Sequence, residues 1–306
     1  MDAKGKVKNS KRNPAQQWLE GVPYEVAFWR SYYANRKRRR ELMSWSQYGQ
    51  PCRLDNFDID AFISGCGEED PVILDVGCAL SYAFGDIIAG RQRKIHYVDA
   101  LAPFYNRILK RYGIQRPPIR FGMVESLSAE FGLSGATFIH IRNALDHCAD
   151  PVKGIIQALM CLRVGGVLYL NHFDNEADRE AYRGFHQFNI TEEDGKLLIW
   201  NLHLEKYFID DIVAPFARVE TSMTGQGRVV AVITKTAELP DRLENAYATA
   251  ASLALMSMDI VEYFHSVPRA IGYQMLRLYC TVGHRFVRRL PYFMQRRLKW
   301  AFRRFM

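Results

Sequence analysis

Histidines and carboxylates that could move a proton are the first candidates for chemistry in this 306-residue chain. Asp146 and His147 lie just after one apolar run, His172 lies just after the next, and His186 follows 14 residues later. Histidine suits a general base because its pKa lies near neutral pH. We expect His147 to be the base, with His186 as the first alternative and His172 as the second. Asp146 or Glu176 would orient the imidazole ring.

The same histidines do not predict a metal site. Their separations of 25 and 14 residues match no recognised pattern of metal ligands. The six cysteines are scattered without a C-x-x-C pair, which indicates neither a zinc site nor a disulfide framework. We therefore expect no metal, free thiols and a reducing compartment.

A second set of candidates begins at Asp75-Val76-Gly77, where a short apolar run meets a turn of small residues. Such a run predicts a buried parallel strand, and the pattern beyond the turn predicts a helix from about Ala83. A strand, a tight turn and a helix start are typical of nucleotide-binding folds, in which backbone N–H groups approach the ligand. The loop lacks the second and third glycines of a dinucleotide fingerprint, so it argues only weakly for NAD.

Asp99 is the matching acid on the next predicted strand, residues 94–99. It lies 22 residues after Gly77. An acid at the end of the second strand suits a bidentate hydrogen bond to ribose hydroxyls. Two anchors at this spacing are much harder to obtain by chance than one.

Alternating strands and helices organise the middle of the chain. Further strands are predicted over 118–121, 137–141 and 167–170, and an antiparallel pair over 216–220 and 228–234. The alternation implies a parallel sheet with right-handed crossovers, in which ligands lie beyond the carboxyl ends of the strands. The polar residues that converge on this rim are Asp75, Gly77, Asp99, Glu125, Asn143, His147 and His172.

The chain resembles a bacterial family of class I S-adenosylmethionine-dependent methyltransferases in the motifs LDVG, YVDA, FGMVESL, RNALDHCADP, LRVGGVLYLNHFDNEA, GFHQFN and IWN. The similarity runs from Trp18 to Lys235, and NALDH and HQ-aromatic-N are its most selective signatures. Members of this family are often tied to surface-polysaccharide loci. The resemblance implies an α/β fold with a Rossmann-like, mostly parallel, seven-stranded methyltransferase sheet and helical N- and C-terminal extensions.

The resemblance also implies S-adenosylmethionine as the cofactor and assigns residues to its parts. Asp75, Gly77 and Ala79 would face the methionine end, Asp99 would take the ribose, Val124 and Glu125 would lie beside the adenine, and Asn143 would border the methyl donor. Two residues depart from the family pattern. Ala79 stands where glycine or another small residue is usual, and Met123 stands where an acid commonly reads the adenine amino group.

The atom that accepts the methyl group is predicted to be oxygen. The fourth strand ends in RNAL and not in the Asn/Asp-Pro-Pro-aromatic sequence that grips amino groups in many methyltransferases acting on DNA or protein amides. The resemblance implies a sugar of a glycan or glycolipid as the acceptor. Alignment with the sulfonium methyl can supply most of the rate, and His147 would take the hydroxyl proton.

Composition and charge divide the chain into four parts. We expect a disordered basic tail at 1–13, an N-terminal helical cap at 14–68, the S-adenosylmethionine-binding domain at 69–238 and a basic helical extension at 239–306. The net charge is +8 over residues 1–40 and +10 over 263–306, but −10 between them. Basic ends favour polyanions, either nucleic acid or an anionic membrane surface.

The last predicted helix runs from Pro291 to Met306 and is basic and amphipathic. It places Met294, Leu298, Ala301, Phe302 and Phe305 on one side. Such a helix lies in a membrane interface or docks its apolar stripe on the core, and we favour the membrane. Neither a signal peptide nor a spanning segment is visible in the sequence, so we expect a cytoplasmic protein, peripheral on the inner membrane face.

Three functions follow as hypotheses. The first is an O-methyltransferase acting on a glycan or glycolipid. The second is an RNA methyltransferase whose basic ends grip phosphates, although the middle of the chain is net negative and shows no aromatic-basic stacking surface. The third is a non-catalytic scaffold, against which Asp75, Gly77 and Asp99 argue.

Overall fold

The computed structural model describes residues 14–239, 278, 284–287 and 289–302. The predicted tail at 1–13 and most of the predicted extension at 239–306 therefore lie outside the described part of the chain. Among the described residues, no helix has both the length and the apolar character needed to cross a membrane.

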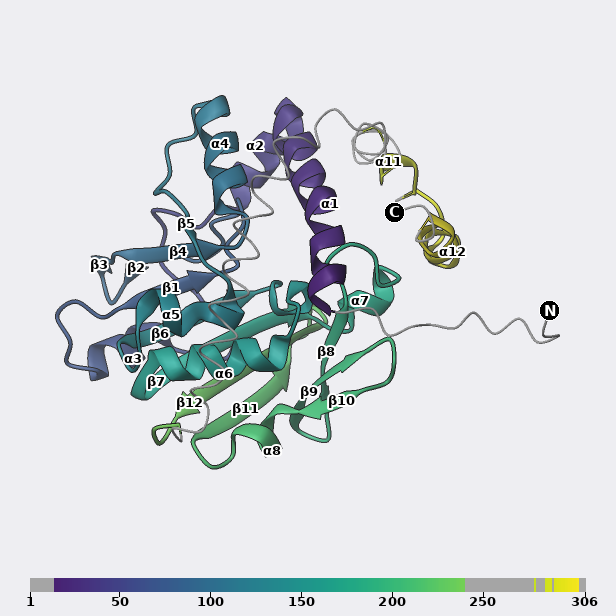
Figure 1. The fold of residues 1–306 in the computed structure, drawn as a ribbon. Coiled ribbons are helices and arrows are strands. Elements are labelled where there is room, and N and C mark those ends of the chain that lie inside the picture. The colour runs from purple at the N-terminus through teal and green to yellow at the C-terminus, as the bar shows by residue number, and fades with distance from the viewer. Residues whose placement is uncertain (1–13, 240–277, 279–283, 288, 303–306) are drawn as a thin grey trace.

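A seven-stranded sheet forms the centre of the fold (Figure 1). Its spatial order is β11-β12-β7-β6-β1-β4-β5. Strand β12 runs antiparallel to both of its neighbours, and the other pairs are parallel. This is the Rossmann-like, mostly parallel sheet that the sequence predicts, closed at one edge by the predicted antiparallel pair. The strands are β1 (Ile73–Val76), β4 (Ile95–Asp99), β5 (Arg120–Phe121), β6 (Ala136–Arg142), β7 (Leu162–Phe173), β11 (Ala217–Met223) and β12 (Arg228–Lys235).

The sheet separates two apolar cores, because successive residues of a strand point to opposite faces. In β6, Phe138 packs in the core on one face and Ile139 packs in the core on the other. All four residues of β1 are buried. Continuous burial of this kind is typical of a parallel strand that is covered on both sides.

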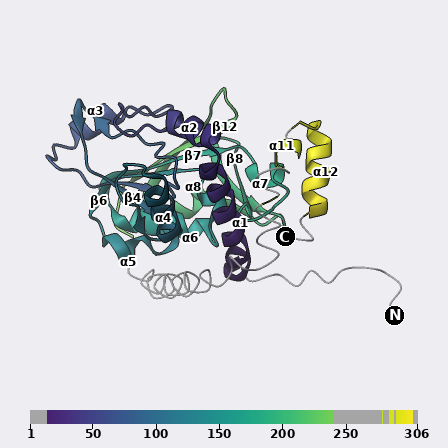
Figure 2. The same cartoon turned by 90° about the horizontal axis from the view of Figure 1, so that it is seen from above.

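Helices and a small second sheet cover the two faces (Figures 1 and 2). The Phe138 core receives side chains from α1 (Pro14–Ala34), α2 (Arg36–Trp45), α3 (Ile59–Gly65) and α4 (Ala102–Tyr112). The Ile139 core is covered by α5 (Leu127–Phe131), α6 (Pro151–Cys161), α8 (Ile209–Val213) and an antiparallel sheet of β8 (Phe188–Glu193), β9 (Lys196–Asn201) and β10 (Lys206–Phe208). The shorter elements are β2 (Ile87–Ile88), β3 (Arg91–Gln92), η1 (Val124–Ser126), η2 (Leu145–His147), α7 (Glu176–Arg179) and α11 (His284–Val287).

The helix predicted from about Ala83 is absent. Residues 79–93 are irregular apart from the short hairpin of β2 and β3. They are held by the segment before α3, where the Cys52 N–H donates to the Ile87 carbonyl at 2.8 Å. Gly85 lies so close to this segment that a Cβ would stand 2.6 Å from the Cys52 Cα. The prediction was wrong because this long-range pairing, which a local pattern does not contain, overrides local helix propensity.

The predicted N-terminal cap, residues 14–68, shares its buried side chains with the sheet. Trp18 and Val22 of α1 and Ile59 and Ile63 of α3 all belong to the Phe138 core. The described part of the cap and one face of the sheet therefore have one continuous core.

Helix α12 (Tyr292–Phe302) occupies most of the predicted C-terminal helix. Its first residues, Tyr292, Phe293 and Met294, are 58%, 62% and 40% exposed, whereas Leu298 is half-buried. The beginning of the predicted apolar stripe is therefore open to solvent among the described residues.

Candidate functional site

A cavity of about 440 Å³ opens at the carboxyl ends of β1, β4 and β6. This size lies within the range of small-molecule sites. The N-terminal helices form one wall of the cavity through Trp18, Glu25 and Trp29 of α1 and Leu42 and Trp45 of α2. The wall opposite comes from the ends of the strands.

Gly77 makes the turn after β1 at a φ of +69°, which glycine adopts without strain. Its N–H donates to the Val98 carbonyl at 2.8 Å. A Cβ at this position would lie 2.2 Å from the Cβ of Ala144, in the loop after β6. Glycine is therefore required both by the backbone conformation and by the close approach of the two loops that border the cavity.

Asp99 lies at the end of β4, buried and lining the cavity. Its Oδ2 accepts a hydrogen bond from the Ala79 N–H at 3.0 Å, and its Oδ1 accepts one from the Leu101 N–H at 2.8 Å. Burial raises the pKa of Asp99 to about 7, against the opposing effect of the two N–H donors. Each carboxylate oxygen retains a second lone pair, so Asp99 can still accept hydrogen bonds from ligand hydroxyls.

Asp75 lies in β1 and also lines the cavity. Its Oδ1 lies 2.7 Å from Nδ1 of His140, its register partner in the adjacent β6, and both side chains are buried. The sequence analysis missed His140. A histidine in the otherwise apolar run TFIHI was the available signal, because it predicts a polar partner on the neighbouring strand.

Glu125 and Val124 lie in η1 on the cavity wall, next to Met123. Glu125 Oε1 accepts a hydrogen bond from the Ala149 N–H at 2.8 Å, in the loop before α6. The carboxylate is buried, and burial raises its pKa. Glu125 therefore fixes the loop before α6, while Val124 and Met123 give this part of the wall an apolar surface.

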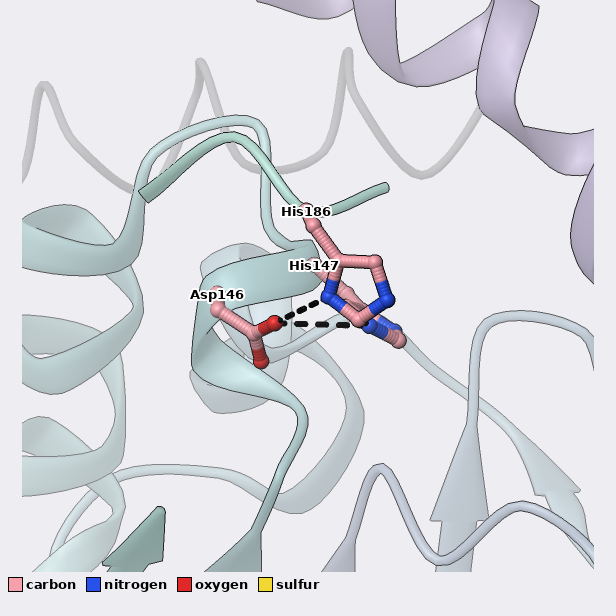
Figure 3. Close-up of side chains that lie close together, drawn as sticks. All are labelled: Asp146, His147 and His186. Carbon is pink, nitrogen blue, oxygen red and sulfur yellow. Dashed lines mark hydrogen bonds and ion pairs between the residues drawn. The ribbon is translucent and has the colours of Figure 1, made fainter. Parts of the chain in front are cut away.

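Asp146, His147 and His186 form a cluster at the rim (Figure 3). Asp146 Oδ2 lies 2.7 Å from His186 Nδ1 and 3.4 Å from His147 Nε2, and the two ring nitrogens lie 3.1 Å apart. His147 lines the cavity. Asp146, and not Glu176, is the carboxylate that contacts both rings.

The three groups of this cluster differ in charge at neutral pH. Burial alone would raise the pKa of Asp146, but the neighbouring His147 and the hydrogen bond from His186 hold it below its usual range. Burial alone would lower the pKa of His186, but the hydrogen bond to Asp146 raises it to about 9. Burial lowers the pKa of His147. The cluster is therefore an Asp146–His186 ion pair beside a neutral His147, which is free to take a proton.

Among the described residues, the same three side chains also have the spacing of a candidate metal site. One ligand atom from each lies within 4.8 Å of the others. Two imidazole nitrogens and a carboxylate oxygen are suitable ligands for zinc. Coordination would require loss of the proton that His186 Nδ1 shares with Asp146, so the ion pair and a bound metal exclude each other.

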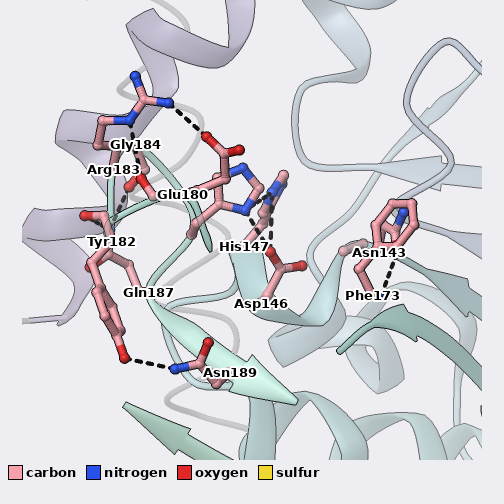
Figure 4. A network of polar contacts seen from close by, with 12 residues as sticks. Asn143, Asp146, His147, Phe173, Glu180, Tyr182, Arg183, Gly184, Gln187 and Asn189 are labelled. Carbon is pink, nitrogen blue, oxygen red and sulfur yellow. Dashed lines mark hydrogen bonds and ion pairs between the residues drawn. The ribbon is translucent and has the colours of Figure 1, made fainter. Parts of the chain in front are cut away.

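The loop that carries His186 is fixed by its own side chains (Figure 4). Arg183 Nη2 donates to Glu180 Oε2 at 2.6 Å, and Asn189 Nδ2 donates to the Tyr182 hydroxyl at 2.7 Å. The N–H of Gln187 donates to the backbone carbonyl of Asp146 at 3.1 Å. Gln187 and Asn189 of the HQ-aromatic-N signature thus hold His186 against Asp146.

Helix α1 packs directly on this loop. The Trp18 and Phe185 rings stack with their centroids 5.3 Å apart. A Cβ on Gly21 would lie 2.4 Å from Phe185 Cδ1, so the glycine allows the helix to approach the ring. Of the aromatic residues that the sequence offered as a cap or an acceptor wall, Trp18 and Trp29 reach the cavity.

His172 lies in β7 and does not line the cavity. Its ring is 2% exposed, and neither nitrogen has a hydrogen-bond partner among the described residues. Burial lowers its pKa to about 3. His172 is therefore neutral and is not placed to take a proton from a ligand in the cavity.

A polar network missed by the sequence analysis surrounds Asn143, which lies at a φ of +48° after β6. Asn143 Oδ1 accepts hydrogen bonds from the Phe173 N–H at 3.1 Å and from Arg228 Nη2 at 3.0 Å (Figure 4 shows the first). Arg228 also donates to the Asn171 side chain and to the Asn171 carbonyl. An arginine that begins an apolar strand was the available signal, because β12 runs antiparallel and starts at the rim.

No protein-family model and no curated protein matches the chain. Solved structures that are similar include an S-adenosylmethionine-dependent methyltransferase from Aquifex aeolicus, with 12% identity, 59% of this chain and 90% of that chain covered, and a TM-score of 0.37. A second, from Methanosarcina mazei, has 22% identity, coverage of 60% and 100%, and a TM-score of 0.35. A third, the T. thermophilus 16S rRNA N2 G1207 methyltransferase in complex with AdoMet and guanosine, has 14% identity, coverage of 62% and 42%, and a TM-score of 0.34. What the cavity binds must therefore follow from its own residues.

Proposed function

We propose that the chain is an S-adenosylmethionine-dependent methyltransferase that methylates an oxygen atom. The observation that carries the proposal is one cavity bordered by the Gly77 turn, the Asp99 carboxylate and Asn143. In this arrangement Asp99 accepts hydrogen bonds from the ribose hydroxyls. The Gly77 turn faces the methionine end of the cofactor, and Asn143 borders the methyl donor.

The irregular segment after β1 supports this cofactor over a dinucleotide. A pyrophosphate is usually held at the N-terminus of the helix that follows the first strand, and residues 79–93 contain no such helix. S-adenosylmethionine carries no phosphate and needs none. The apolar surface of Met123 and Val124 fits the face of an adenine ring.

His147 serves as the general base in this proposal. The Nε2 atom faces Asp146 and His186, so an N–H there donates to Asp146 and leaves the lone pair on Nδ1. The acceptor oxygen attacks the methyl carbon, the carbon–sulfur bond breaks to give a neutral thioether, and the hydroxyl proton passes to His147 Nδ1. The Asp146–His186 pair orients the ring and compensates the positive charge that forms on it.

The acceptor in this proposal is a sugar of a glycan or glycolipid at an anionic membrane surface. This part rests on the family resemblance and on α12, where Tyr292, Phe293 and Met294 are exposed beside the exposed Arg297. Aromatic and basic side chains together suit a membrane interface. Steeply salt-dependent binding to RNA and none to anionic vesicles would favour the nucleic-acid alternative instead.

Calorimetric titration with S-adenosylmethionine and S-adenosylhomocysteine tests the proposal. We expect the wild type to bind both, and Asp99→Ala to bind each at least about tenfold more weakly, because hydrogen bonds to a charged group contribute about 1.5–3 kcal/mol each. The matched control is Asp211→Ala, which removes an exposed carboxylate outside the cavity. Absence of binding by the wild type would refute the cofactor, and equal binding by Asp99→Ala would refute the site.

A further inference from the structure

Two arginines line the cavity on the side of Asn143 that faces away from the Gly77 turn. Arg228, at the start of β12, is 3% exposed, and Arg142, at the end of β6, is exposed. Strand β12 lies beyond β7 from β6 in the sheet, whereas β1 and β4 lie on the other side of β6. The arginines therefore belong to the acceptor half of the proposed site.

Arg228 is a buried cation without a carboxylate beside it. Its Nε and Nη2 donate only to neutral groups of Asn171 and Asn143, and its guanidinium lies 4.2 Å from the centroid of the Phe173 ring. No ion pair joins it to any acid of the described residues. Its Nη1 has no hydrogen-bond partner within the described part of the chain. A buried charge is normally paired, so this one lacks its counter-ion.

Arg142 increases the excess of positive charge. Its guanidinium makes no ion pair or side-chain hydrogen bond with a described residue, and it lines the same cavity. Burial, together with the charge of Arg142, lowers the pKa of Arg228 to about 10. Both observations indicate a place at which an anion would be stabilised.

We infer that Arg228 and Arg142 bind an oxyanion of the methyl acceptor, a carboxylate or a phosphate on the sugar. The inference rests on the proposed function and specifies its substrate class as a sugar acid or a sugar phosphate. A guanidinium presents parallel N–H donors that match either group. Because Arg228 Nη2 also donates to Asn143, the anion would be held directly beside the residue that borders the methyl donor.

The cofactor's own methionine carboxylate is the competing source of this anion, so the test separates the two. The full-length protein, saturated with S-adenosylhomocysteine, is titrated at constant ionic strength with glucuronate, glucose 6-phosphate and glucose. We expect one or both anions to bind more tightly than glucose. Arg142→Gln and Arg228→Gln should weaken that binding at least tenfold, while Arg218→Gln, on the exposed part of β11, should leave it unchanged. Since Arg142 is exposed, its variant carries the test even where Arg228→Gln does not fold.

The cofactor arm compares S-adenosylhomocysteine with 5′-methylthioadenosine, which lacks the carboxylate. Unchanged affinities for both compounds in the two variants support the acceptor assignment. Loss of affinity for S-adenosylhomocysteine alone would transfer the arginines to the cofactor and overturn the inference. It would also be overturned if neither anion bound more tightly than glucose to the saturated wild type. Failure of the wild type to bind S-adenosylhomocysteine would instead refute the proposed function.

Discussion

Replacing Asp146 with asparagine should remove a pH dependence of stability that the Asp146–His186 pair creates. The pKa of His186 is raised from 6.5 to about 9 in the folded protein. Between these values the folded state holds a proton that the unfolded chain has lost. The contribution is therefore complete below the unfolded pKa and is lost as the pH rises to about 9.

The magnitude follows from the width of this window. Stability falls by about 1.4 kcal/mol per pH unit while the two states differ by one proton, so the His186 contribution falls by about 2 kcal/mol between about pH 7.5 and 9. The His186 side chain is 19% exposed, so solvent screening is modest. In Asp146→Asn the partner charge is gone and burial keeps His186 neutral throughout the window, so its contribution becomes flat.

The assay is urea unfolding of the wild type and of Asp146→Asn at both pH values. The quantity of interest is the difference between the two pH-dependent changes in unfolding free energy, because ionisation of the cysteines affects both proteins equally. Asp211→Asn, which removes an exposed carboxylate, should behave like the wild type. A difference below about 0.5 kcal/mol would show that His186 is not the charged partner of Asp146, and the neutral state assigned to His147 would lose its basis.

Three further predictions concern the same rim. Gly77→Ala should destabilise the fold by about 1–3 kcal/mol and abolish cofactor binding, because its Cβ would lie 2.2 Å from that of Ala144; Ala144→Gly in the same chain should restore part of the stability, and no restoration would contradict the clash. His147→Gln should lower kcat on any identified acceptor by about 10²-fold or more with unchanged affinity for S-adenosylhomocysteine, and an unchanged kcat would exclude His147 as the base. Dialysis against EDTA should leave the Tm unchanged, whereas about one zinc per chain that is lost in Asp146→Asn would show that the cluster binds metal instead.

The strands and their polar ends were predictable because the signal is local. A short apolar run followed by Asp or Gly predicted β1 and β4, and a parallel sheet brings such ends to one rim whatever the details of the connections. The structure accordingly gathers Asp75, Gly77, Asp99 and Asn143 around one cavity. His147 and His186 were also selected, each for its own position in the sequence.

What the sequence did not contain was the pairing between distant segments. His147 and His186 were candidates for one role, but the structure gives them different charges because both contact Asp146. The helix predicted from Ala83 was wrong for a related reason, since the segment near Cys52 competes for the same backbone. Arg228 was missed because only the antiparallel return of β12 brings it to the rim.

The shared core of residues 14–68 and the sheet has a consequence for biosynthesis. During translation α1 and α3 are made first, but the residues that bury them, such as Phe138 and Tyr169, follow about a hundred residues later. Contacts of such high sequence separation form late and slow the folding of a chain. Trp18 and Trp29 can therefore close the cavity only after the sheet exists, so the ligand site is completed in one of the last steps of folding. A nascent chain that is released or cleaved before that step would present the apolar face of β6 and β7 to chaperones and proteases.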